Sequence, residues 1–342
     1  MKKSFLVILA LLFVAVWVSV AAAAPNVASV SQKGSVLVFP RFDISGDKDT
    51  VVILTNDYKL PVWVRGIYVS PTQETNDFLL ELSPFKTISW SIRYGKSDFI
   101  ATVPRSFYEK GYLIIFASDS TGTTQLNWNH LYALAKLVDY SAQSSWQAWE
   151  YQPWTFAART ASLGQPVGDP GLIVLDGASF DACPQYLNYN IMMSGEAYDF
   201  FQDTQLTLLP CKQDVTQYPK ATRTKAVFQI ANENETWLSG AEKCVSCWFE
   251  YLLSGISPNF LKGIAGTSAG HFKVYGVASP KCNITGNAAV ATPFVGVAVE
   301  KLNFLAYGPV ELAGTEGTSS GVAAGFIKYD SNPSDIPEGP GK

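Results

Sequence analysis

The chain alternates between short apolar runs and clusters of turn-forming residues. The runs are rich in Val, Ile, Phe, Trp and Tyr, and groups of Gly, Pro, Asn and Asp separate them. Short runs of β-branched and aromatic residues between turn residues are typical of strands. The pattern therefore predicts early strands at Ser35–Phe39, Thr50–Thr55, Val62–Val69, Phe78–Leu82, Thr87–Ile92 and Gly111–Ala117.

Sustained helical spacing is almost absent from the chain. The best helical candidate is His130–Val138, but its apolar residues fill both sets of alternate positions. This filling suits a strand that is buried on both faces. We therefore predict a strand there and an all-β protein.

Four sequence features recur in the same order in two parts of the chain. They are a strand ending in Asn and an acidic residue, an aromatic strand, a Ser-Pro pair and a closing strand: Val52–Asp57 and Phe228–Glu233, Val62–Tyr68 and Cys244–Phe249, Ser83-Pro84 and Ser257-Pro258, Tyr112–Ser118 and Lys273–Ser279. This order favours an internal duplication that forms two immunoglobulin-like β-sandwiches. The alternative remains open that turn residues this common recur in unrelated sandwiches.

These features divide the chain into five parts. A signal peptide is expected at 1–23, a first β-sandwich at 34–159, a connector at 160–222, a second β-sandwich at 223–330 and a disordered tail at 331–342. The connector holds Cys183 and Cys211 and two strand-like runs, Gly171–Leu175 and Gln205–Leu209. The tail is rich in Pro and Gly and has little apolar surface to order it.

The N-terminus has the three parts of a secretory leader. Met1-Lys2-Lys3 is basic, Phe5–Val20 is almost wholly apolar, and Ala21–Ala24 offers a small-residue cleavage site. The apolar run is shorter than the ~20 residues of a membrane-spanning helix, and no later run reaches that length. We expect cleavage between Ala23 and Ala24 and no transmembrane span in the mature chain. The protein is then exported to the periplasm, the cell surface or the medium.

Composition narrows the functional classes. Charged residues make up only 16 % of the chain and the net charge is −4, so nucleic acid, which needs a cationic surface, is not an expected partner. Two His and three Met argue against a haem protein or a His-built metal site, and no cofactor is expected.

All five cysteines follow the leader, and disulfides are the usual state of exported cysteines. We prefer a bridge from Cys183 to Cys211 and a second from Cys282 to either Cys244 or Cys247, which leaves one thiol free. Cys244 and Cys247 also form a C-x-x-C pattern. A redox pair needs a helix after its first Cys, and zinc needs two further ligands, so a structural disulfide is favoured.

Gly266–Gly270 has the pattern G-x-S-x-G and resembles the nucleophile loop of patatin-like lipases. That resemblance implies Ser268 as nucleophile and an Asp in a D-G-A motif, and Asp176-Gly177-Ala178 is present. In that family, however, the Asp follows the Ser. A nucleophile elbow also lies between a strand and a helix, whereas we expect strands on both sides of Ser268. A loop between two strands is the favoured interpretation.

Aromatic residues gather just before the predicted connector. The candidate ligand-binding residues are Trp146, Trp149, Tyr151 and Trp154, followed by Phe156. Flat rings can stack on sugars, so the cluster could form a saccharide platform. The favoured alternative is that these rings seal the contact between the first sandwich and the connector, because large rings are mostly buried.

Several motifs together resemble a group of uncharacterised exported proteins of Gram-negative bacteria. They are Gly34–Pro40, Thr55-Asn56, Trp128–Leu131, Asp181–Pro184 and Cys244–Trp248. The Thr55-Asn56 turn and the strand after Pro61 also resemble immunoglobulin-like domains of bacterial surface and periplasmic proteins. The resemblance implies export and a β-rich fold, and it carries no activity.

The leader, the repeated β pattern and the lack of a credible catalytic set predict a non-enzymatic structural or binding protein of the cell surface or periplasm. Its partner would be a protein or a polysaccharide. The alternative is a carbohydrate-binding module or a polysaccharide-active enzyme that uses the cluster from Trp146 to Phe156.

Overall fold

The computed structural model describes residues 26–95, 103, 105–141, 147–195, 201–215, 221–284, 286–302, 310–311 and 325–331. The predicted signal peptide, Trp146 and residues 332–342 of the predicted tail lie outside this part of the chain. Strands make up 54 % of the structure and helices 5 %, which confirms the all-β prediction. The described residues contain no helix with the length and apolar character needed to cross a membrane.

The first sandwich consists of two facing sheets. One sheet has the order β4-β3-β6-β1-β9 and the other β19-β8-β7-β2-β5. The strands are β1 (Val36–Asp43), β2 (Lys48–Asn56), β3 (Val62–Val69), β4 (Thr75–Leu82), β5 (Thr87–Ser91), β6 (Lys110–Ser118), β7 (Leu131–Asp139), β8 (Gln147–Tyr151), β9 (Trp154–Phe156) and β19 (Val310–Glu311). Apolar side chains from both sheets form one core between them, for example Leu37 and Leu113 with Val52 and Trp90.

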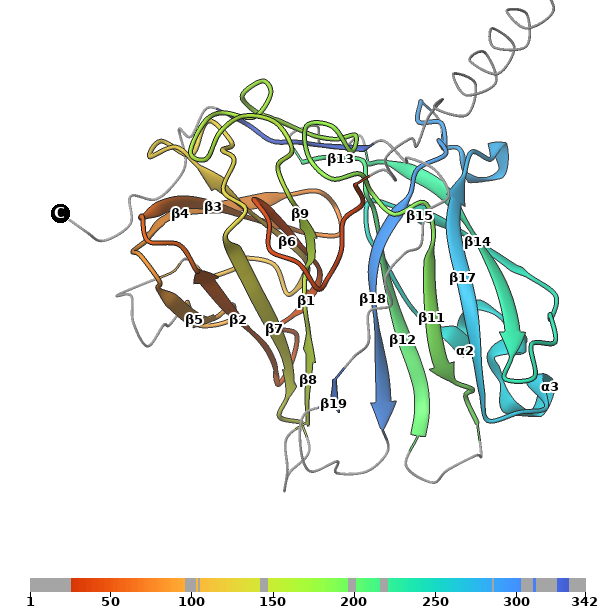
Figure 1. Ribbon diagram of the computed structural model, residues 1–342. Coiled ribbons are helices and arrows are strands. Elements are labelled where there is room, and N and C mark those ends of the chain that lie inside the picture. The colour runs from red at the N-terminus through yellow and green to blue at the C-terminus, as the bar shows by residue number, and fades with distance from the viewer. Residues whose placement is uncertain are drawn as a thin grey trace, which may run out of the picture.

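The second sandwich again has two sheets, with the orders β15-β14-β17-β11 and β16-β12-β18 (Figure 1). Its strands are β11 (Leu187–Met192), β12 (Phe201–Pro210), β14 (Arg223–Asn232), β15 (Ala241–Ser246), β16 (Phe249–Leu252), β17 (Ala269–Val277) and β18 (Phe294–Leu302). Short helical turns connect β16 to β17 and follow β17: α2 (Leu253–Ile256), η1 (Pro258–Phe260), α3 (Lys262–Ala265) and η2 (Pro280–Cys282).

A third, small sheet joins distant parts of the chain. It has the order β10-β20-β13, with β10 (Leu172–Leu175), β20 (Gly325–Lys328) and β13 (Gln213–Asp214). Strand β20 pairs antiparallel with β10 and parallel with β13. The segment before the second sandwich is thereby tied to the C-terminal part of the described chain.

The two sandwiches have the same strand order. If β1 to β7 are matched in chain order with β11, β12, β14, β15, β16, β17 and β18, each of the five pairings among β1 to β7 recurs in the second unit, whereas β8, β9 and β19 extend only the first. All of these pairings are antiparallel in both units. This shared strand order is the one expected if the two units arose by duplication of a single β unit.

The matching differs from the one that the sequence features suggested. Asn56 ends β2, whereas Asn232 ends β14, the counterpart of β3. Ser83-Pro84 lies between β4 and β5, but Ser257-Pro258 follows the counterpart of β5. Only the closing strands, β6 and β17, are true counterparts. Turn residues mark the ends of strands without saying which strand ends there.

The boundary of the second unit also differs from the prediction. Strands β11 and β12 fall within the predicted connector at 160–222, yet β11 pairs with β17 and β12 pairs with β16 and β18. The second sandwich therefore begins at Leu187. The run Gln205–Leu209 was identified as a strand, but its partners come much later in the chain, where local patterns give no information.

In the immunoglobulin fold, strands B and E pair in one sheet and strands C and F in the other. Strands β2 and β5 pair here in the same way, as do β3 and β6. The outer strands exchange sheets: β1 lies beside β6 and β7 lies beside β2. The fourth strand also differs, because β4 lies beside β3 and β15 beside β14. Both units are thus immunoglobulin-like in their central strands and share the same variations at their outer strands.

The central strands β1 and β6 are buried on both faces, whereas the edge strand β4 of the same sheet has one face partly in solvent. Along β1, Leu37 and Phe39 point into the core of the first sandwich, while Val36 and Val38 join a second core. That second core includes Phe228 of β14 and much of the interior of the second sandwich. The two sandwiches therefore pack as one body around a shared middle layer.

Candidate functional site

The structure places the predicted aromatic platform in the interior. Trp149, Tyr151 and Trp154 are 8 %, 4 % and 1 % exposed, and Phe156 is fully buried. Their ring faces are thus not offered to solvent. They are buried, as the sealing interpretation expects: Trp154 and Phe156 share a core with Ile173 and Phe180 of the predicted connector, and Trp149 and Trp154 also contact β18 of the second sandwich.

Two of these rings cover the open edge of β18. The indole N–H of Trp154 donates to the Gly296 carbonyl at 2.9 Å, and that of Trp149 donates to the Glu300 carbonyl at 2.8 Å. These carbonyls are four residues apart, so they point to the same side of β18, which is an edge strand of its sheet. An unpaired strand edge can pair with another molecule and cause aggregation. Here the two indole N–H groups provide hydrogen-bond donors for carbonyls of β18 within the same molecule.

Charged groups also meet where the sandwiches touch. Arg41 of β1 pairs with Asp43 at 3.2 Å and with Glu250 of β16 at 2.9 Å, and Lys110 pairs with Glu250 at 2.9 Å. Burial acts to raise the pKa of Asp43, but the hydrogen bonds from Ser45 and the charges of Arg41 and Lys110 outweigh it and lower the pKa. These ion pairs hold β1 and β6 against β16.

The disulfide prediction is confirmed. Cys183 bonds to Cys211 and joins the approach to β11 to the end of β12. Cys282 bonds to Cys244 and joins η2 to the edge strand β15. Cys247 remains free and buried, and its thiol lies 3.9 Å from the Ser70 carbonyl of the first sandwich.

Cys247 lacks the setting of a redox thiol. Burial raises its pKa to about 12, against smaller lowering effects of hydrogen bonds with Tyr112 and Gln73. A reactive thiolate needs the opposite shift. The described residues also contain no group of three or more His, Cys, Asp and Glu side chains that could hold a metal ion.

Ser268 lies in a turn that follows a helix and precedes a strand, which is the opposite order to that of a nucleophile elbow. Helix α3 ends at Ala265, where the sequence analysis expected a strand, and β17 begins after Ser268 at Ala269. An elbow has the strand first and the helix second, so that the helix N-terminus faces the reacting group. Asp176, the proposed partner, instead accepts hydrogen bonds from the backbone N–H groups of Ala178 and Ser179.

The outer face of the sheet β15-β14-β17-β11 carries a groove of about 430 Å³. Its lining residues come from the segment before β11, from β14 and from β17: Gln185, Tyr186, Gln229, Lys273, Tyr275, Gly276 and Val277. Because side chains alternate along a strand, β17 points Phe272 and Val274 into the core and Lys273 and Tyr275 into this groove.

Polar side chains form a row across the floor of the groove. Lys273 lies opposite Gln229 on β14 and opposite Asn188 on β11. Its ammonium group is 3.7 Å from the centroid of the Tyr186 ring. A second depression of about 270 Å³, lined by Gln229, Trp237, Leu238 and Gly240, meets the first at Gln229.

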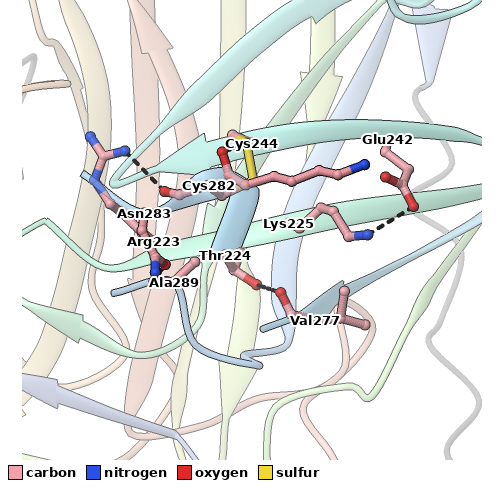
Figure 2. The surroundings of a disulfide bond; sticks show 10 residues. Arg223, Thr224, Lys225, Glu242, Cys244, Val277, Cys282, Asn283 and Ala289 are labelled. Carbon is pink, nitrogen blue, oxygen red and sulfur yellow. Dashed lines mark hydrogen bonds and ion pairs between the residues drawn. A yellow bond between two sulfur atoms is a disulfide. The ribbon is translucent and has the colours of Figure 1, made fainter. Parts of the chain in front are cut away.

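The Cys244–Cys282 disulfide braces the Val277 end of the groove (Figure 2). Beside it, the Thr224 hydroxyl donates to the Val277 carbonyl at 3.3 Å, and Lys225 pairs with Glu242 at 2.8 Å. Gly276 allows a neighbouring segment to approach closely, because a Cβ there would lie 2.0 Å from the Thr292 carbonyl. The groove is therefore preformed by covalent and backbone contacts.

Aromatic rings, side-chain amides and an ammonium group can together bind a polar ligand with flat apolar faces. The sequence analysis did not find this set. The alternation of polar and apolar residues in His271–Tyr275 was a usable signal, because it marks a strand with one face in solvent. The positions of Tyr186 and Gln229 in the groove could not be predicted from the sequence, because strand pairing brings them there from distant segments.

We predict that Trp154→Phe destabilises the protein by about 1–3 kcal/mol, because the buried Gly296 carbonyl loses its donor. Urea unfolding followed by circular dichroism measures the change. The matched control is Trp237→Phe, whose ring is 63 % exposed, and its effect should stay within about 0.5 kcal/mol. Equal stability of the Trp154 variant and the wild type would show that the edge contact is unimportant.

We also predict that a serine-reactive fluorophosphonate leaves Ser268 unmodified in the folded protein, because no helix follows the residue. Mass spectrometry of the treated protein measures modification, with Ser268→Ala as the control. Specific labelling that disappears in this variant would overturn the prediction.

The chain matches no protein family model, and no curated protein is significantly similar to it in sequence.

Proposed function

We propose that this chain is an exported, non-enzymatic binding protein of the periplasm or cell surface. The observation that carries the proposal is the preformed groove on the outer face of the second sandwich, held on a body whose two halves share a core. A rigid frame lowers the entropy lost when a surface site binds its ligand.

Export is supported by the chemistry of the cysteines. Two disulfides, one of them buried, are typical of proteins that fold outside the cytoplasm. The leader-like N-terminus and the resemblance to exported proteins of Gram-negative bacteria point the same way. Membership of that group is part of the proposal.

A carbohydrate-binding role is the form of binding that the groove favours. The sequence analysis assigned it to the rings from Trp146 to Phe156, and the described members of that cluster are buried. The groove offers the same chemistry elsewhere, with Tyr186 and Tyr275 beside the amide of Gln229. Glycoside hydrolysis uses a pair of carboxyl groups. The described residues that line the groove include Gln and Lys but no Asp or Glu, which supports binding over hydrolysis.

Export is tested on protein purified from its native host. Cell fractionation should place it in the periplasm, at the surface or in the medium, and intact mass should show a chain that starts near Ala24. The mass before and after reduction should correspond to two disulfides. A chain that still begins at Met1 in the cytoplasmic fraction would contradict the proposal.

Binding is tested by cosedimentation of the purified mature protein with cell walls and by affinity electrophoresis in envelope polysaccharide, both from the native host. The folded protein should be retained by at least one of these materials, and the reduced, unfolded protein should not be. Absence of retention in every case, or release of new reducing ends from the polysaccharide, would contradict a non-enzymatic binding role.

A further inference from the structure

The groove and the neighbouring depression form one extended strip along β17 and β14. Tyr186 and Tyr275 lie in the first depression and Trp237 in the second, with Gln229 common to both. The Trp237 ring is 63 % exposed and stands edge-to-face against His271, 6.0 Å between ring centroids. Aromatic rings thus occur in both depressions, as a ligand made of repeated flat units requires.

The volume and lining of the groove suit a sugar ring. About 430 Å³ falls within the range of roughly 300–1,000 Å³ of small-ligand sites. Tyrosine rings can cover the apolar face of a pyranose, and the amides of Gln229 and Gln185 can donate to and accept from its hydroxyl groups. An apolar peptide side chain would leave these amides without partners, which is costly.

The charge of the strip favours an acidic ligand. Among the described residues that line the two depressions, Lys273 alone is charged. Its ammonium group contacts the Tyr186 ring, and no ion pair to a carboxylate is recorded for it in the described part of the chain. The neighbouring Lys225, by contrast, already pairs with Glu242. Lys273 can therefore form an ion pair with a carboxylate of a bound ligand.

From this geometry we infer that the strip on the outer face of the β11, β17 and β14 strands binds a carboxylated oligosaccharide. Lys273, held against the Tyr186 ring, pairs with a uronate carboxylate, Tyr275 contacts the sugar face, and Gln229 bonds hydroxyl groups of the unit that leads towards Trp237. The inference rests on the proposed binding function and specifies its ligand class and its residues.

The experiment uses the mature protein and isothermal titration calorimetry with oligogalacturonate. Dextran oligosaccharides of equal length serve as the neutral comparison. Oligogalacturonate should bind at least tenfold more tightly than dextran, and its affinity should fall as salt rises because the ion pair is exposed to solvent. Equal affinity for the two sugars, or binding of neither, would overturn the inference.

Variants locate the site. Lys273→Gln should weaken oligogalacturonate binding by about tenfold, because it removes the charge and keeps a flexible polar side chain. Tyr275→Ala and Trp237→Ala should each weaken it at least threefold through lost stacking. Lys59→Gln, an exposed lysine of the first sandwich, makes the same charge change and should leave binding unaltered.

Circular dichroism and unfolding midpoints should be unchanged in all four variants, since the altered side chains lie at least partly in solvent. Tight binding that none of the three strip variants weakens would overturn the inference. If envelope material retains the protein and oligogalacturonate does not bind, only the ligand class fails. If no envelope material retains it either, the proposed function fails as well.

Discussion

The rest of the structure depends on two paired strands, β1 and β6, that have no face in water. Strands β1 and β6 place alternate side chains into two different cores, so that Val36 and Leu37, adjacent in sequence, stabilise different sandwiches. These two strands lose the apolar contacts of one whole face if the two sandwiches separate. At about 25 cal/mol per Å² of apolar surface, that loss is large, and separation of the units is correspondingly unfavourable.

This shared layer explains the position of the tryptophans and of the groove. A packed interface buries the edge of β18, whose carbonyls then need donors within the protein, and the indole groups of Trp149 and Trp154 supply them. The sheet that contains β11 and β17 keeps its outer face free because its inner face already belongs to the common core. Corresponding sheets of the two units therefore have different environments. The sheet with β1 and β6 lies between the two cores, whereas the matching sheet with β11 and β17 carries the groove on its outer face.

Local patterns predicted the strands well and their partners poorly. The strand at His130–Val138 exists as β7, although only one of its faces is buried: Leu131 and Ala133 point inward and Tyr132 is 41 % exposed. The Cys183–Cys211 bridge was predicted because it closes a short loop. Strand β12 was recognised as apolar but was assigned to a connector, since its partners β16 and β18 lie far along the chain. The groove was missed for the same reason, because Tyr186, Gln229 and Lys273 meet only through strand pairing.

The most direct test of the shared core uses Cys247, the one free thiol among the described residues. It belongs to the second sandwich, and its sulfur lies against Ser70 of the first. The rate of its modification by a thiol reagent at rising urea concentrations gives the free energy of the opening that exposes it. If the sandwiches form one body, that free energy and its urea dependence equal those of global unfolding. Modification through an opening of much lower free energy and weak urea dependence would show that the two sandwiches separate while folded, and would contradict the account.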